Sequence, residues 1–114
     1  MPISNSEQEF VSHIVDLMQS IGPVQAKRMF GGHGIFLDGL MFGLIADSEL
    51  YLKADKNDAD AFINRGLEAF SYRNKDRLFK MAYYQAPEEA LEDTEAMNAW
   101  ANQAYAVALQ AASK

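Results

Sequence analysis

Residues 27–55 read KRMFGGHGIFLDGLMFGLIADSELYLKAD, an apolar run punctuated by glycines, with an Asp-Gly pair near its middle. An Asp-Gly pair between two apolar runs is a strong signal for a two-residue hairpin turn. A second polar pair, Asp47-Ser48, marks another turn farther along. The stretch therefore predicts a tight antiparallel meander of three strands, near residues 27–37, 40–46 and 49–54.

Helical patterns flank this meander. Apolar residues at helical spacing predict a first helix over residues 6–20, which Gly22-Pro23 ends because proline cannot continue the hydrogen-bond ladder. A short helix over residues 58–65 follows the meander, with Asn57 expected as its N-cap. The last helix is expected to start at Asp93 or Thr94 and to run to about residue 112.

Two more strands are expected between the second and last helices, at residues 68–73 and 78–85, around a polar turn. The resulting order is α-β-β-β-α-β-β-α. Strands joined by hairpins rather than crossovers favour an α+β fold, a two-layer sandwich with helices packed on one face of an antiparallel sheet. Such a sheet has open edges, through which a homodimer could form.

Composition narrows the class of protein. The chain has 114 residues, of which 49% are hydrophobic, so we expect a single domain over residues 1–114. The net charge of −6 makes direct nucleic-acid binding improbable, because phosphate backbones repel an acidic domain. The chain has no cysteine, no signal peptide pattern and no apolar run long enough to span a membrane, so we expect a cytoplasmic location and no membrane contact.

The sequence carries no recognisable catalytic or metal-binding motif. Gly31-Gly32-His33-Gly34 matches neither a dinucleotide-binding nor a P-loop pattern, and is better explained by strands that approach closely. Neither His13 nor His33 is followed by a second histidine or a carboxylate at position i+4, as an H-E-x-x-H metal site requires. We therefore expect no enzyme activity, no cofactor and no metal. The alternative is an enzyme or a small-ligand-binding domain with a pocket near His33 and the sheet tyrosines.

The basic segment over residues 65–80 has three possible roles. Residues 65–80 hold five basic side chains against two acidic ones, and aromatic residues are interleaved with them. On a sheet, such a pattern can bind single-stranded nucleic acid, dock an acidic protein, or keep a hairpin tip soluble.

The wording RMFGGHGIFLDGLMFGLIADSELYLKAD, followed by MAYYQAPEEALEDTEAMNAWA, resembles the N-terminal domain of the TfoX/Sxy family over about residues 10–110. The resemblance implies a fold of the secretion-chaperone-like type and a role in regulating bacterial competence for DNA uptake. Longer members carry a second, helical C-terminal domain. Family regulators are thought to work through protein contacts and to cooperate with the cyclic-AMP receptor protein at promoters.

The resemblance thus favours a non-enzymatic protein-interaction module, an accessory regulator of transcription. Its protein partner would belong to the transcription machinery or be the cyclic-AMP receptor protein. The glycine segment and the basic hairpin are the expected contact surface. The candidate contact residues are Arg28, Gly31, Gly32, His33, Arg73, Lys75 and Arg77.

Overall fold

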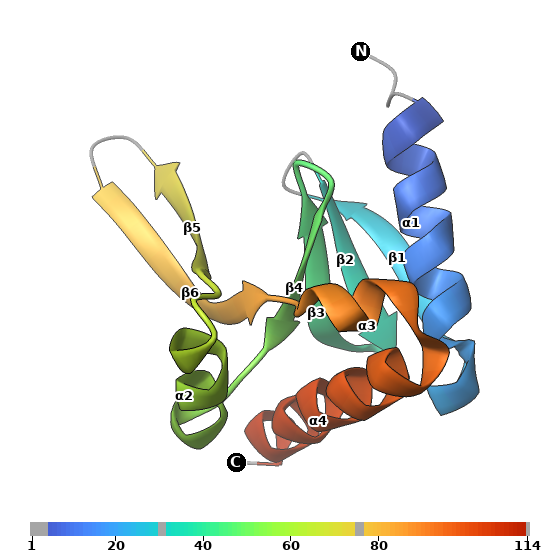
Figure 1. Cartoon of the computed structure of the whole chain (residues 1–114). Helices are drawn as coiled ribbons and strands as arrows, with labels where there is room; N and C mark the ends of the chain where they lie inside the picture. The colour runs from blue at the N-terminus through green and yellow to red at the C-terminus, as the bar shows by residue number, and fades with distance from the viewer. Residues whose placement is uncertain (1–4, 30–31, 75–76, 114) are drawn as a thin grey trace.

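A computed structural model describes residues 5–29, 32–74 and 77–113 of the chain (Figure 1). The helices and strands follow one another as α1 (Asn5–Met18), the 3-10 turn η1 (Gln19–Ile21), β1 (Gln25–Met29), β2 (Gly32–Leu37), β3 (Leu40–Ala46), β4 (Glu49–Lys53), α2 (Lys56–Asn64), β5 (Ala69–Asn74), β6 (Arg77–Gln85), α3 (Glu88–Glu92) and α4 (Thr94–Ala112). The α+β class is confirmed, and so is the grouping of the helices against an antiparallel sheet.

The strands form one six-stranded sheet in the order β1-β2-β3-β4-β6-β5, with every neighbouring pair antiparallel. Both predicted two-residue turns are present. Asp38 and Gly39 have φ of 52° and 80°, and Asp47 and Ser48 have φ of 51° and 59°. Positive φ at both central residues matches the right-handed twist of the flanking strands. The two turns thus set the register of β2, β3 and β4.

The predicted strand over residues 27–37 is wrong, because that segment forms two strands. β1 runs back along β2, so that Arg28 pairs with His33 and Met29 with Gly32. The sequence pattern missed the reversal because no polar turn pair separates the two apolar runs. Residues 30 and 31, which join them, lie outside the described residues. The sheet therefore has one strand more than the predicted order.

Helix boundaries also differ in detail. α2 begins two residues before the predicted start, because the N-cap is Asp55, whose side chain accepts from the Asp58 N–H at 2.8 Å, and not Asn57. The sequence also predicts a helical turn that begins at Pro87, and the short α3, whose N-cap is Pro87, confirms it. The start of α4 is as predicted, because the Asp93 side chain accepts from the Ala96 N–H at 2.9 Å.

The core lies between one face of the sheet and the helices (Figure 1). Ile14 and Met18 of α1 and Met97 of α4 are fully buried there. Ile35 of β2 and Leu52 of β4 point into the same cluster and are also fully buried. The repeated alanines of α4, which are smaller than most core residues, let this helix lie close to the sheet. The core therefore depends on one amphipathic sheet face.

A cluster of aromatic rings joins α2 to the rest of the core. The Phe62 ring stacks on Tyr84 of β6 at 5.5 Å and packs against Trp100 of α4 at 5.2 Å between centroids. The Arg65 guanidinium lies 5.6 Å from the Trp100 ring centroid and forms a two-pronged ion pair with Glu89 of α3. Helices α2, α3 and α4 are thus tied together at one place.

The β5–β6 hairpin extends beyond the body of the sheet. β6 pairs with β4 only over Tyr83, Tyr84 and Gln85, whereas its pairing with β5 continues to Asn74 and Arg77. Figure 1 shows this end of the hairpin projecting away from α4. We call residues 69–74 with 77–82 the β-arm.

Gly32 should be intolerant of any side chain. A Cβ at this position would lie 2.1 Å from the Ile45 carbonyl oxygen, so β2 and β3 would have to move apart. We expect Gly32→Ala to lower the free energy of unfolding by about 1–3 kcal/mol in urea titrations. Gly39→Asn is the control, because Gly39 has open space around it and asparagine tolerates positive φ. Equal stability of the two variants would contradict this account.

The Arg65–Glu89 pair should give an acid-sensitive contribution to stability. Hydrogen bonding from Arg65 lowers the pKa of Glu89, so this contribution is present above the ordinary glutamate pKa and is lost as pH falls through the lowered value. We expect Glu89→Gln to lower the Tm slightly at neutral pH, since the pair is exposed, and the gap to vanish in acid. Glu88→Gln, on the same exposed turn, is the control. A pH-independent gap would refute the role of the ion pair.

Candidate functional site

The described candidate contact residues fall into two groups at opposite edges of the sheet. Arg28 and His33 are cross-strand neighbours on β1 and β2, and Gly32 is paired with Met29 beside them. Arg73 and Arg77 lie at the far end of the β-arm, where Arg73 is paired with Leu78 and Arg77 with Asn74. β3 and β4 separate the groups. Gly31 and Lys75 lie outside the described residues. The structure therefore does not bring the predicted contacts into one surface.

His33 is a half-buried side chain on the helix-covered face of the sheet. Its pairing with Ile45, a core residue, places it there. Its Nδ1 atom is buried and has no hydrogen-bond partner within the part of the chain that the structure describes. Tyr51 and Tyr83, in contrast, lie on the other face. A single pocket that combines His33 with these two tyrosines is therefore not formed.

The face of the sheet away from the helices carries an apolar and aromatic surface that the sequence analysis did not identify. We call this surface the open sheet face. The strand register places its members in adjacent rows across β1 to β6. They are Lys27, Met29, Phe36, Met41, Leu44, Tyr51, Lys53, Phe70 and Tyr83. Alternation in β4, where Tyr51 and Lys53 alternate with buried leucines, was a signal for it.

Gly34 shapes the centre of the open sheet face. A Cβ there would meet the Met29 sulfur at 2.5 Å, the Phe36 ring at 2.8 Å and the Met41 sulfur at 3.3 Å. These three side chains therefore fold over the glycine and fill the space that a larger residue would take. The result is a patch of two thioethers and a ring, a type of surface that adapts to different apolar groups.

Two lysines lie over aromatic rings on the open sheet face. The Lys27 Nζ is 5.1 Å from the Phe36 centroid, and the Lys53 Nζ is 5.0 Å from the Tyr83 centroid. Such contacts hold an ammonium group in place and stabilise it by about 0.5–1 kcal/mol at exposed sites. The Tyr83 hydroxyl donates to the Met41 carbonyl oxygen at 3.4 Å, and burial raises the pKa of Tyr83, which keeps that donor protonated. The two ammonium groups are therefore held in place by the aromatic rings beneath them.

Acidic groups gather around Tyr51 on this face. Burial, followed by the charges of Glu49, Asp47 and Glu68, raises the pKa of Tyr51. The Gln85 side-chain amide joins β4 to the segment that precedes β5. Its nitrogen donates to the Glu49 carboxylate at 2.7 Å, and its oxygen accepts from the Glu68 backbone N–H at 3.0 Å. The open sheet face thus carries the ammonium groups of Lys27 and Lys53, and acidic groups lie around Tyr51.

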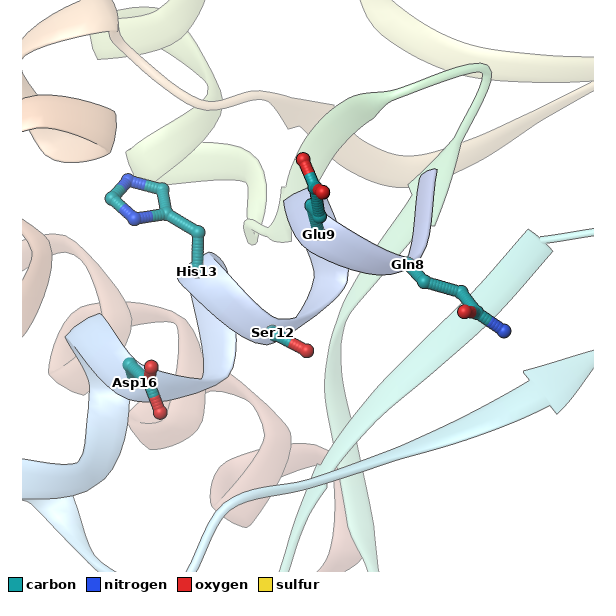
Figure 2. A pocket seen from close by; sticks show the side chains of 5 residues that line it. All are labelled: Gln8, Glu9, Ser12, His13 and Asp16. Atoms are coloured by element: carbon teal, nitrogen blue, oxygen red, sulfur yellow. The ribbon is translucent and has the colours of Figure 1, made fainter. Parts of the chain in front are cut away.

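A surface hollow lies along α1. It is lined by Gln8, Glu9, Ser12, His13 and Asp16. Figure 2 shows the His13 ring and the Ser12 hydroxyl pointing to different sides of the helix. The His13 Nε2 is 2.8 Å from the Leu91 carbonyl oxygen of α3, so this histidine joins two helices. Among the described residues, no group of three or more histidine, aspartate or glutamate side chains could hold a metal ion.

Comparison with known proteins gives a consistent result. A model of the TfoX N-terminal domain family matches residues 16–108. The chain is 27% identical over 86 residues to the DNA transformation protein TfoX1 of Aliivibrio fischeri, which covers 75% of this chain and 39% of that protein. It is 24% identical over 73 residues to Protein Sxy of Escherichia coli K12, which covers 64% of this chain and 35% of that protein. The chain thus spans less than two fifths of either relative.

The helices give no sign of a membrane segment. Within the described part of the chain, none combines the length and the apolar character that crossing a bilayer requires.

Proposed function

The chain belongs to the TfoX N-terminal domain family, and from this membership we propose that it is a non-enzymatic protein-interaction module. It would act in the bacterial cytoplasm as an accessory regulator of transcription in competence. The observation that carries this proposal is the one-sided packing of the sheet, which leaves an ordered apolar and basic face without a helix over it. Ordered aromatic and methionine groups on a surface are typical of protein contacts.

The proposal extends to the kind of partner. One relative is named a DNA transformation protein, which favours a role close to DNA uptake. A partner from the transcription machinery, or the cyclic-AMP receptor protein, would place the domain at promoters without direct DNA contact. The net charge of −6 supports this proposal, because the partner rather than this acidic domain would then bind the DNA phosphates.

Self-association through β1 receives little support. β1 is an edge strand and carries two adjacent cations, Lys27 and Arg28, both exposed. In an antiparallel pairing of two copies through this edge, these charges would come close together, which is a common device against edge-to-edge pairing. We therefore propose a different protein as the partner.

Affinity capture tests the proposal. We expect the tagged chain to retain a component of the transcription machinery or the cyclic-AMP receptor protein from bacterial lysate after nuclease treatment, because the contact is between proteins. Deletion of the gene should also change transcript levels of DNA-uptake genes. Capture that disappears with nuclease, together with unchanged transcripts, would contradict the proposal.

Charge reversal in the β-arm tests the predicted contact residues. We expect Arg73→Glu with Arg77→Glu to reduce the captured partner, because a cationic arm would lose its attraction for an acidic surface. Arg73→Lys with Arg77→Lys keeps the charge and is the matched control. If the reversed variant retains every partner at the level of the control, these two arm residues are not part of the contact.

A further inference from the structure

Charge is segregated between the two layers of the fold. The six strands contain the basic residues Lys27, Arg28, Lys53, Arg73, Arg77 and Lys80 but one acidic residue, Glu49. The four α-helices contain nine acidic residues but one basic residue, Lys56. A chain that is acidic overall therefore has strands that are mainly basic and helices that are mainly acidic, while the turns of the sheet add Asp38 and Asp47. Such a distribution favours the approach of an acidic partner from the sheet side.

We propose that the open sheet face is the docking surface for an acidic polypeptide segment of another protein, which also supplies apolar side chains. This inference rests on the proposed function and names the surface and the chemistry of the partner. Carboxylates of the segment would pair with Lys27 and Lys53. Its apolar groups would pack on Met29, Met41 and the Phe36 ring.

The cation–π geometry favours a protein segment over single-stranded nucleic acid. Bases bind to an open sheet by stacking on free aromatic faces. On this face, Lys27 lies over the Phe36 ring and Lys53 over the Tyr83 ring, and Tyr83 is only 6% exposed. The third ring, Tyr51, meets Phe70 edge-on at 5.1 Å beside acidic groups, which would repel phosphates. The surface therefore presents ammonium groups and thioethers rather than stacking platforms.

The charge pattern also disfavours a second copy of this chain. Two open sheet faces packed about a twofold axis would enclose four ammonium groups, those of Lys27 and Lys53 from each copy, in one interface. The open sheet face of one copy against the acidic helices of another would be complementary, but that contact is head-to-tail and repeats without closing. An acidic segment of a different protein satisfies both the charge and the apolar groups.

A hollow beside Lys27 gives the segment a place to anchor. It has a volume of about 180 Å³ and is lined by Pro23, Gln25, Lys27, Phe36, Asp38 and Gly39. Lys27 lines this hollow together with Asp38 and Gly39 of the β2–β3 turn. A single side chain of the partner fits a space of this size, and its neighbouring carboxylate would reach Lys27.

Photo-crosslinking inside bacteria tests the inference. A benzophenone amino acid is placed at Phe36, on the open sheet face, or at Ile63, a 54% exposed residue of α2 that serves as the matched position on the helix side. We expect protein adducts from position 36, and peptide sequencing should map them to segments with more aspartate and glutamate than lysine and arginine. Adducts of position 36 with nucleic acid, with a second copy or with a basic segment would overturn the inference.

Charge variants supply the second readout. Lys27→Glu with Lys53→Glu should lower the adduct yield at position 36 about tenfold, which corresponds to about 1.4 kcal/mol. Lys27→Arg with Lys53→Arg keeps the charges and the ring contacts, so its yield should be unchanged, and thermal melts of both variants verify folding. An equal yield from the Glu and Arg variants would overturn the inference.

The two crosslinking positions separate this inference from the proposed function. Protein adducts from position 63 alone would reject the open sheet face as the docking surface and leave an interaction module in place. Absence of protein adducts from both positions would contradict the inference and the proposed function together.

Discussion

The structure depends on one constraint, which is that a single sheet is covered by helices on one face only. Every strand must therefore direct its core residues to the same side, as Ile35, Ile45 and Leu52 do. The strands are brought close enough for this by Gly32, whose missing side chain leaves room for the Ile45 carbonyl oxygen. Because the helices cover one face only, the side chains on the other face pack on one another.

That arrangement explains why the open sheet face is ordered although no helix covers it. Leu44 is only 2% exposed there, between its cross-strand partners Gly34 and Tyr51. Long lysine side chains cover apolar surface with their methylene groups and keep their charge in water. The same contacts hold two ammonium groups at defined positions. The packing of lysines on rings thus produces a surface with a defined charge pattern.

The helices are held together at one place, where the end of α2 contacts α3 and α4. Arg65 follows α2, stacks on Trp100 of α4 and pairs with Glu89 of α3. Both partners of the ion pair are exposed, so most of the stability at this point comes from the Phe62, Tyr84 and Trp100 rings rather than from charge. The acidic side chains of the helices remain in water and give this layer its negative charge.

Local chemistry made the turns and the last helix predictable. Asp38-Gly39 and the Asp93 cap act through backbone geometry within a few residues, so their patterns were sufficient. The reversal between β1 and β2 was missed because no polar turn pair separates the two segments in the sequence. The predicted contact residues Arg28 and Arg73 proved to lie on opposite edges of the sheet, which only the strand order reveals. The open sheet face was not predicted as one surface, because its members come from all six strands and only the alternation in β4 pointed to it.

Methionine methyl NMR tests the central claim most directly, because the chain carries reporters on both sides of the sheet. Met29 and Met41 lie on the open sheet face, whereas Met18 and Met97 are fully buried in the core. A synthetic peptide that alternates glutamate with leucine and phenylalanine should shift the Met29 and Met41 signals and leave those of Met18 and Met97 in place. The same peptide with glutamine in place of glutamate should shift them much less. Unshifted Met29 and Met41 signals, or equal shifts with both peptides, would contradict the account.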